Sequence, residues 1–143
     1  MRAIVLAGGL GTRLASVTHE IPKPMAPIGS RPFLEYLLDD LVEQGIEQVV
    51  LAVSYRWEVI RQHFGSVYRS MDLSYSVEEE PLGTGGAIQQ AMSTITDDEV
   101  VVLNGDTRFR VNLAKMEKVH RNTDAQLTMA LKQVADSGRF GRV

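Results

Sequence analysis

Three glycines in four positions, Gly8, Gly9 and Gly11, follow an apolar run near the start of the chain. Glycine lets backbone amides approach a phosphate where a side chain would collide. Arg13 comes two residues later, and Lys23 stands between two prolines close to the same loop. Arginine can hold phosphoryl oxygens with two hydrogen bonds, and lysine supplies a compact charge. The spacing favours a phosphate-binding loop framed by two cations over the alternative of a tight turn with two solvated charges.

This loop matches neither of the two common glycine-rich nucleotide motifs. A Walker A loop has a lysine directly after its final glycine, and this loop has none. A dinucleotide fingerprint has a third glycine where Leu14 stands. We therefore expect a phosphate site of another kind.

A carboxylate, Asp106, follows a second apolar run and Gly105. Magnesium takes one or two carboxylates and completes its shell with water and substrate phosphates, so one aspartate can start such a site. The alternative is a turn aspartate that bonds its own backbone. The three histidines, His19, His63 and His120, lack the spacing of a metal site and are interpreted as structural.

Alternating strands and helices must position these residues. The pattern predicts strands over 3–7, 48–53, 73–78, 100–104 and 126–132, and helices from Pro32, with Ser30 as a cap, to Gly45, then over 56–64, 84–93 and 112–121. Continuous apolar strands in such an order indicate a three-layer α/β fold, with a mostly parallel sheet covered by helices on both faces. Ligands bind at the carboxyl ends of such strands, which directs attention to the segments after Gly8, Glu78 and Asn104.

The composition of the chain limits the kinds of partner that we expect it to bind. With 143 residues, 44% of them hydrophobic, we expect one domain over residues 1–143. A net charge of −3 gives no general attraction for nucleic acid, and no apolar run is long enough for a membrane span or signal peptide. The chain has no cysteine, which excludes thiol chemistry. We predict a cytoplasmic protein with no nucleic-acid or membrane partner, and leave a homo-oligomer open.

Four segments together carry a resemblance to a known family. They are LAGGLGTRL at 6–14, PKPMAPI at 22–28, PLGTGGA at 81–87 and LNGD at 103–106. In this order they resemble the motifs of the sugar-1-phosphate nucleotidyltransferases, over the whole chain. The resemblance implies the Rossmann-like nucleotide-diphospho-sugar transferase fold. It also implies that a second metal-binding aspartate lies beyond residue 143, so that the chain would be C-terminally truncated.

The resemblance also implies roles for individual residues. Arg13 and Lys23 would be catalytic, and Asp106 would hold Mg²⁺. The nucleotide would contact Leu6, Ala7, Gly8, Gly9, Gly11, Thr12, Glu78, Pro81, Gly83, Thr84, Asn104 and Gly105. The partners would be a nucleoside triphosphate and a sugar 1-phosphate, joined with release of pyrophosphate.

Glu78 lies where this family reads the base. A carboxylate can accept both hydrogen-bond donors on the Watson–Crick edge of guanine, so Glu78 favours GTP, with a solvated acidic strand end as the alternative. The segments 74–88 and 102–109 look most like the branch that guanylylates D-glycero-α-D-manno-heptose 1-phosphate, for lipopolysaccharide or capsule biosynthesis. Mannose-1-phosphate guanylyltransferases come next, then uridylyl- or thymidylyltransferases. A non-catalytic nucleotide-sugar-binding subunit and an inactive fragment remain as other classes.

Overall fold

The computed structural model describes residues 1–9, 21–97 and 99–134. The chain divides into two compact units, Met1–Arg108 and Phe109–Val143. The first unit contains every strand that the structure describes, and the second contains the helix α4. The prediction of one domain over residues 1–143 stays a prediction. Within the described ranges, no helix is both long enough and apolar enough to cross a membrane.

The elements alternate much as the sequence predicts. In chain order they are β1 (Arg2–Leu6), the 3-10 helix η2 (Lys23–Met25), β2 (Pro27–Ile28), β3 (Arg31–Pro32), α1 (Phe33–Glu43), β4 (Gln48–Val53), α2 (Trp57–Phe64), β5 (Val67–Tyr68), β6 (Met71–Val77), α3 (Gly83–Met92), β7 (Val100–Asn104) and α4 (Leu113–Asn122). Strands β4 and β7 have the predicted bounds.

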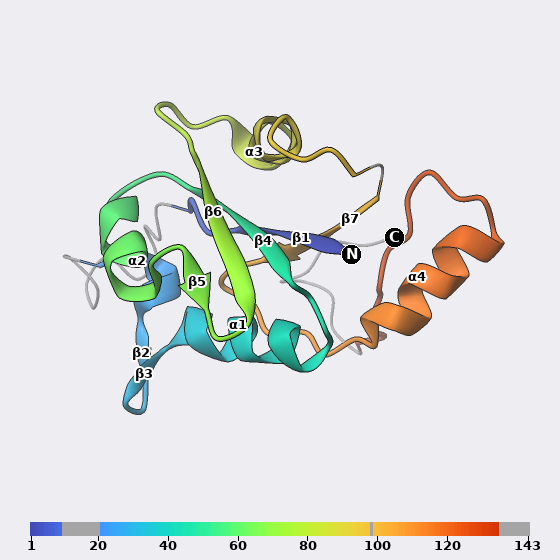
Figure 1. The fold of residues 1–143 in the computed structure, drawn as a ribbon, viewed down its shortest axis with the longest axis horizontal. Helices are drawn as coiled ribbons and strands as arrows, with labels where there is room; N and C mark the ends of the chain where they lie inside the picture. The colour runs from blue at the N-terminus through green and yellow to red at the C-terminus, as the bar shows by residue number, and fades with distance from the viewer. Residues whose placement is uncertain (10–20, 98, 135–143) are drawn as a thin grey trace. The chain divides into compact units, whose positions relative to one another are not determined.

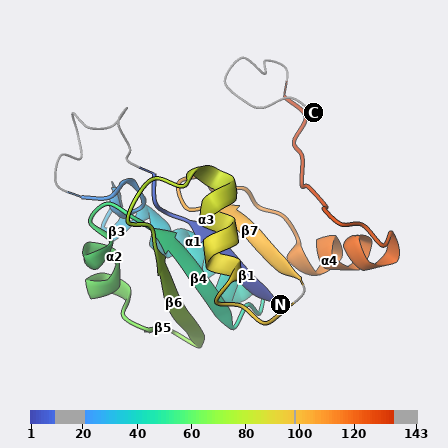
Figure 2. The same ribbon diagram turned by 90° about the horizontal axis from the view of Figure 1, so that it is seen from above.

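Five strands form one sheet in the order β5-β6-β4-β1-β7. Strand β1 pairs in parallel with β4 and with β7, and β4 pairs in parallel with β6. Only the short β5 is antiparallel, as the first strand of a hairpin with β6. Helix α3 covers one face, and α1 and α2 cover the other (Figures 1 and 2). The predicted three-layer α/β fold is confirmed, and the carboxyl ends of β1, β4, β6 and β7 meet at one edge.

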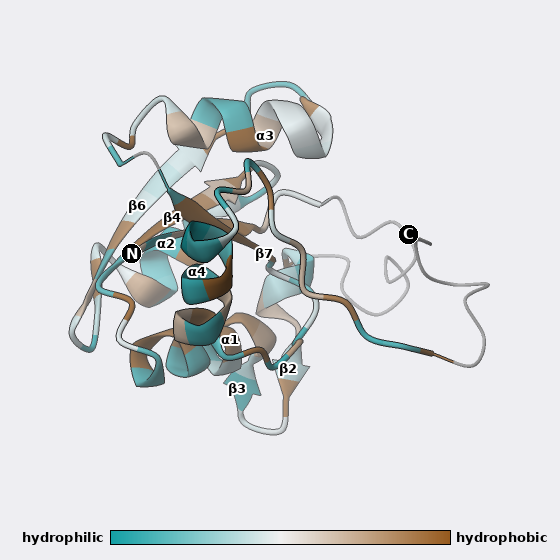
Figure 3. Cartoon of the chain, turned by 90° about the vertical axis from the view of Figure 1, so that its right-hand side faces the viewer, coloured by the Kyte–Doolittle hydropathy of each residue, from teal (hydrophilic) through white to brown (hydrophobic). Residues whose placement is uncertain are grey.

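The central strands β1 and β4 bury apolar residues on both sides because each face of the sheet meets a helix. In β1, residues Ala3, Ile4 and Val5 are fully buried. Ile4 belongs to a cluster with Ala87 and Ala91 of α3, so small residues let this helix lie close to the sheet. Helix α1 buries one face through its leucines, and Figure 3 shows both hydrophobic and hydrophilic residues on α1 and α3. This packing fixes the sheet edge that carries the site.

Two helix starts differ in their capping. The predicted cap of α1, Ser30, is wrong, because Pro32 is the N-cap and no side chain caps this end. Proline fixes its own φ and lacks an N–H, which suits the start of a helix. At α4, Asn112 lies one position outside the helix, and its side-chain oxygen accepts a hydrogen bond from the Lys115 N–H at 2.8 Å.

The predicted strand over 126–132 is wrong, since this segment has no strand structure. Its alternating apolar residues Leu127, Met129 and Leu131 are 76%, 55% and 64% exposed. Alternation signals one apolar face, but a strand also needs a neighbour to satisfy its backbone hydrogen bonds. The described part of the second unit provides no such neighbour. The two-residue strands β2, β3 and β5 are too short for periodicity to reveal.

Candidate active site

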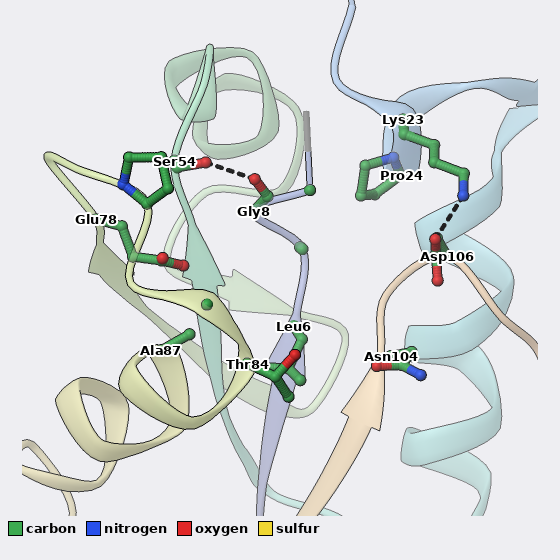
Figure 4. Close-up of a pocket in the computed structure, with 14 residues that line it drawn as sticks. Leu6, Gly8, Lys23, Pro24, Ser54, Glu78, Thr84, Ala87, Asn104 and Asp106 are labelled. Atoms are coloured by element: carbon green, nitrogen blue, oxygen red, sulfur yellow. Dashed lines mark hydrogen bonds and ion pairs between the residues drawn. The ribbon is translucent and has the colours of Figure 1, made fainter. Parts of the chain in front are cut away.

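A cavity of about 470 Å³ opens at the carboxyl ends of β1, β4, β6 and β7 (Figure 4). The residues that line it are Leu6, Ala7, Gly8, Gly9, Lys23, Pro24, Ser54, Glu78, Pro81, Gly83, Thr84, Ala87, Asn104 and Asp106. All of them belong to the first compact unit. The structure thus brings together side chains and backbone from five separate stretches of the sequence.

Most of the predicted nucleotide-binding residues line this cavity. They are Leu6, Ala7, Gly8, Gly9, Glu78, Pro81, Gly83, Thr84 and Asn104, joined by the predicted catalytic Lys23 and metal ligand Asp106. Gly105 does not line it: this glycine is buried, and its N–H donates to the Leu6 carbonyl at 2.8 Å. A Cβ there would lie 2.8 Å from the same oxygen. Gly11, Thr12 and Arg13 lie outside the described residues.

Lys23 and Asp106 form an ion pair on one side of the cavity, with 2.5 Å between Nζ and Oδ2 (Figure 4). Lys23 begins η2, which is anchored by the buried Pro24 and Met25, so the proline-flanked lysine is held in place. The hydrogen bond from Lys23 lowers the pKa of Asp106 below its ordinary value, against the opposing effect of partial burial. Asp106 therefore carries a negative charge at neutral pH.

The donor set around Asp106 fits magnesium only with help from a substrate. Among residues 1–9, 21–97 and 99–134, no three His, Asp or Glu side chains gather in a metal-binding group. Asp106 supplies one carboxylate, and the Thr107 hydroxyl donates to its Oδ1 at 3.1 Å. Magnesium usually keeps several waters and binds through one or two carboxylates and substrate phosphates. A single aspartate beside a cavity that has room for substrate phosphates is compatible with this coordination.

Glu78 follows β6 and enters the cavity from the side opposite Lys23 (Figure 4). Its backbone N–H donates to the Val53 carbonyl at 2.8 Å, which continues the strand pairing. Its Oε2 accepts from the Leu82 N–H at 3.2 Å. The carboxylate thus has a structural role at the start of α3 and still faces the cavity. Its neighbours Glu79 and Glu80 are exposed and do not line the cavity.

Ser54 is a cavity residue that sequence reasoning missed. It directly follows β4, and its hydroxyl donates to the Gly8 carbonyl at 2.5 Å. Its position could have indicated it, because ligands bind at the carboxyl ends of parallel strands and Ser54 follows β4 just as the other cavity residues follow β1, β6 and β7. A single serine forms no sequence motif, so only its position at the carboxyl end of β4 indicates that it lies at the cavity. Pro24 and Ala87 complete the cavity wall.

Neither described histidine lies at the cavity. The ring of His63 meets that of Phe64 edge-on, with 4.6 Å between their centroids. His120 Nδ1 lies 2.9 Å from the Thr128 hydroxyl oxygen. These contacts accord with the structural interpretation, and His19 lies outside the described residues.

Comparison with known proteins agrees with this geometry. The model of the nucleotidyl transferase family matches residues 2–143. The chain is 50% identical over 143 residues to a D-glycero-alpha-D-manno-heptose 1-phosphate guanylyltransferase of Aneurinibacillus thermoaerophilus. It is 40% identical over 142 residues to a mannose-1-phosphate guanylyltransferase of Mycobacterium tuberculosis. The crystal structure of HddC from Yersinia pseudotuberculosis, complexed with GMP-PN, superposes with a TM-score of 0.73 at 38% identity.

The similarity covers nearly all of this chain but only part of the others. The match spans 62% of the A. thermoaerophilus protein and 40% of the M. tuberculosis protein. It covers 83% of this chain and 53% of the HddC chain. The family is thus established over residues 2–143, while the relatives contain further sequence that has no counterpart here.

Proposed function

The chain belongs to the nucleotidyl transferase family, and on that premise we propose that it transfers GMP from GTP to a sugar 1-phosphate and releases pyrophosphate. The observation that carries the proposal is the cavity at one sheet edge. There the backbone of Gly8 and Gly9, the ammonium of Lys23 and the carboxylate of Asp106 lie around one space large enough for a nucleotide. Backbone amides and a cation suit phosphates, and the carboxylate suits the accompanying metal ion.

The reaction requires positioning more than acid–base chemistry. A phosphate oxygen of the sugar 1-phosphate attacks the α-phosphorus of GTP, and a new P–O bond forms. The bond from the α-phosphorus to the oxygen that bridges it to the β-phosphorus breaks, and its electron pair leaves with pyrophosphate. The attacking oxygen is already an anion, so no side chain has to remove a proton. Charge stabilisation and alignment then supply most of the rate enhancement.

The chain's own residues divide this work. In the proposal, Gly8 and Gly9 let the triphosphate lie against the backbone, and Lys23 neutralises charge on the reacting phosphates. Arg13, with Gly11 and Thr12, completes the phosphate loop and holds the departing pyrophosphate. Asp106 would hold Mg²⁺, which would supply positive charge to offset the negative charge of the phosphates.

Glu78 is the proposed reader of the base. Guanine presents N1–H and an exocyclic amine side by side, and a carboxylate can accept both hydrogen bonds. Uracil and thymine present one donor between two acceptors, which suits a glutamine amide better. HddC, which is 38% identical to this chain, is complexed with GMP-PN in its crystal structure, and this supports a guanine nucleotide as the substrate of this chain.

For the sugar, we propose D-glycero-α-D-manno-heptose 1-phosphate. The support is the 50% identity to a heptose 1-phosphate guanylyltransferase, against 40% to a mannose-1-phosphate guanylyltransferase. Mannose 1-phosphate is therefore the second candidate. Such a product is an activated sugar, and we propose that it is made in the cytoplasm for lipopolysaccharide or capsule assembly.

A pyrophosphate-release assay tests the proposal. The full chain is incubated with Mg²⁺, with GTP, UTP, dTTP or CTP, and with heptose, mannose or glucose 1-phosphate. We expect the highest kcat/KM with GTP and the heptose. Turnover with UTP or dTTP alone would remove the guanine assignment, and silence with every pair would favour a non-catalytic binding subunit or an inactive fragment.

A pair of aspartate variants provides the control. Asp106→Asn keeps the side-chain size but loses the charge, and its turnover should fall by about 100-fold or more. Asp72→Asn changes an exposed aspartate at the opposite end of the sheet, where β6 begins its pairing with β4. That variant should turn over like the parent. Equal activity of Asp106→Asn and parent would remove Asp106 from the mechanism.

A further inference from the structure

Ser54 occupies a fixed position between the two strands that flank it. The Ala7 N–H donates to the Ala52 carbonyl at 2.7 Å, and the Glu78 N–H donates to the Val53 carbonyl at 2.8 Å. Strand pairing therefore continues to Ala52 on the β1 side of β4 and to Val53 on the β6 side. Ser54 directly follows the last residue of β4, and its own carbonyl accepts from the Trp57 N–H at 3.1 Å, so it lies between the sheet and the start of α2.

The hydroxyl of Ser54 determines how the first peptide of the glycine loop is turned. It donates to the Gly8 carbonyl oxygen at 2.5 Å. In a planar trans peptide, the carbonyl and the N–H of the next residue point in opposite directions. With the Gly8 oxygen directed at Ser54, the Gly9 N–H is directed away from Ser54. In Figure 4 that is the side of the cavity on which Lys23 lies.

The close approach depends on glycine at position 8. A Cβ there would lie 3.2 Å from Ser54 Oγ and 2.9 Å from Glu78 Oε1. Gly8 and Gly9 are also the two residues whose backbones turn most easily, because neither has a Cβ. Without the Ser54 hydroxyl as a fixed donor to the Gly8 carbonyl, the peptide between them could rotate and present a carbonyl oxygen to the cavity instead of an N–H.

We propose that Ser54 is a positioning residue for the nucleotide's phosphates: it anchors the Gly8 carbonyl and so keeps the Gly9 amide aimed at the triphosphate. The inference rests on the proposed function, since it assumes that a triphosphate occupies this cavity. A donor that is aimed before binding needs no reorganisation when the anion arrives. A carbonyl at that place would repel the phosphate. Ser54 thus acts through Gly9 and need not touch the nucleotide.

Binding of GTP and of guanosine, measured by calorimetry on the full chain, separates this role from general support of the fold. Ser54→Ala should weaken GTP binding by about threefold to tenfold, the worth of one well-placed hydrogen bond. Guanosine has no phosphate, so its affinity should not change. Ser54→Thr keeps the hydroxyl and should restore GTP binding to within about twofold of the parent.

A matched control is Ser93→Ala. The Ser93 hydroxyl also donates to a backbone carbonyl, that of Gln90 at 2.7 Å, but Ser93 does not line the cavity. This variant should bind GTP like the parent. If Ser54→Ala fails to fold, Ser54→Cys has nearly the same volume with a much weaker donor, and the same selective loss of GTP affinity is expected.

The outcomes distinguish the two claims. Parent-like GTP binding by Ser54→Ala, or an equal loss for GTP and guanosine, would overturn the role of Ser54 while leaving the proposed function intact. A parent that binds GTP without releasing pyrophosphate for any sugar would contradict the proposed function but not this inference. A parent that binds no nucleoside triphosphate would overturn both.

Discussion

The ammonium of Lys23 lies 2.5 Å from a carboxylate oxygen of Asp106, although 83 residues separate them in the chain. The cation proposed to hold phosphate and the anion proposed to hold metal therefore neutralise each other when no substrate is present. Phosphate oxygens that approach Lys23 compete with Asp106 for it. The same approach would release the aspartate oxygen for a metal ion, so nucleotide and metal are expected to enter together.

Replacement of Lys23 by methionine should greatly reduce the rate of pyrophosphate release and change the free energy of unfolding only slightly. The two side chains of the pair are 34% and 38% exposed, and solvent-exposed ion pairs contribute about 0–1 kcal/mol. Loss of one charge that stabilises the transition state typically costs about 100- to 1000-fold in kcat. Pyrophosphate release and urea unfolding measure the two effects. Lys118→Met, at an exposed lysine of α4, is the control, and equal rates for both variants would contradict the proposed role of Lys23.

A Glu78→Gln substitution should relax the preference for GTP over UTP. Glutamine retains an oxygen for the Leu82 N–H, so the start of α3 should be preserved. It loses the ability to accept two hydrogen bonds from guanine, and a hydrogen bond to a charged group is worth about 1.5–3 kcal/mol, or roughly 10- to 100-fold in kcat/KM. The neighbouring Glu79→Gln change serves as the control because Glu79 does not line the cavity. An unchanged preference in Glu78→Gln would remove Glu78 from base recognition.

Stability should depend on pH through Asp39 of α1. Burial by itself raises the pKa of Asp39, but hydrogen bonds from Tyr68 and Arg31 and the charges of Arg31 and Arg69 outweigh it, so the pKa is lowered. A carboxyl with a lowered pKa in the folded state stabilises the fold above its unfolded pKa, and that contribution is lost as pH falls through the folded pKa. Its contribution to the free energy of unfolding should therefore decline below about pH 4.

Urea unfolding across pH 2–7 checks this expectation. At neutral pH, Asp39→Asn should be less stable than the parent by about 1–3 kcal/mol, since Tyr68 and Arg31 lose a charged acceptor. The difference between the two proteins should shrink as the pH falls. A difference that stays constant down to the lowest pH would show that the charge of Asp39 does not stabilise the fold.

Two adjacent glycines of α3 should respond in opposite ways to alanine. A Cβ on Gly85 would meet no atom within 4 Å, so Gly85→Ala should stabilise the helix by up to about 1 kcal/mol. A Cβ on Gly86 would lie 2.7 Å from the Leu82 Cβ, and Gly86→Ala should destabilise by about 1–3 kcal/mol. Because Leu82 donates its N–H to Glu78, Gly86→Ala should also weaken GTP preference. Denaturant unfolding of both variants tests the pair, and similar midpoints would contradict it.

The sequence predicted the elements whose signals are local and continuous. The apolar runs of β4 and β7 predicted their bounds, and the motifs that suggested the family are confirmed by the family match over residues 2–143. The same patterns could not show which cavity residues would form hydrogen bonds with each other. The bond between Ser54 and Gly8 joins residues 46 positions apart, and neither side chain nor spacing indicates it.

The two wrong predictions, the strand over 126–132 and the cap Ser30, have the same physical origin. The segment 126–132 alternates like a strand, but pairing depends on a neighbour that periodicity cannot supply. The cap of α1 depends on the path by which the β2–β3 hairpin enters the helix, and that path brings Pro32 rather than Ser30 to the first turn. Local patterns therefore predicted elements well and the contacts between them poorly.

The central place of β1 in the sheet has a consequence for synthesis on the ribosome. Arg2 pairs with Gln48 of β4 and with Val100 of β7, so β1 is flanked by strands that are made later than β1 itself. At about 5–20 residues per second, β7 follows β1 by on the order of 5–20 s. During that interval one edge of β1, whose residues Ala3 to Leu6 are apolar, is open. The nascent chain thus exposes the apolar residues of β1 before their partner β7 exists, which makes it a natural client for chaperones that bind emerging polypeptides.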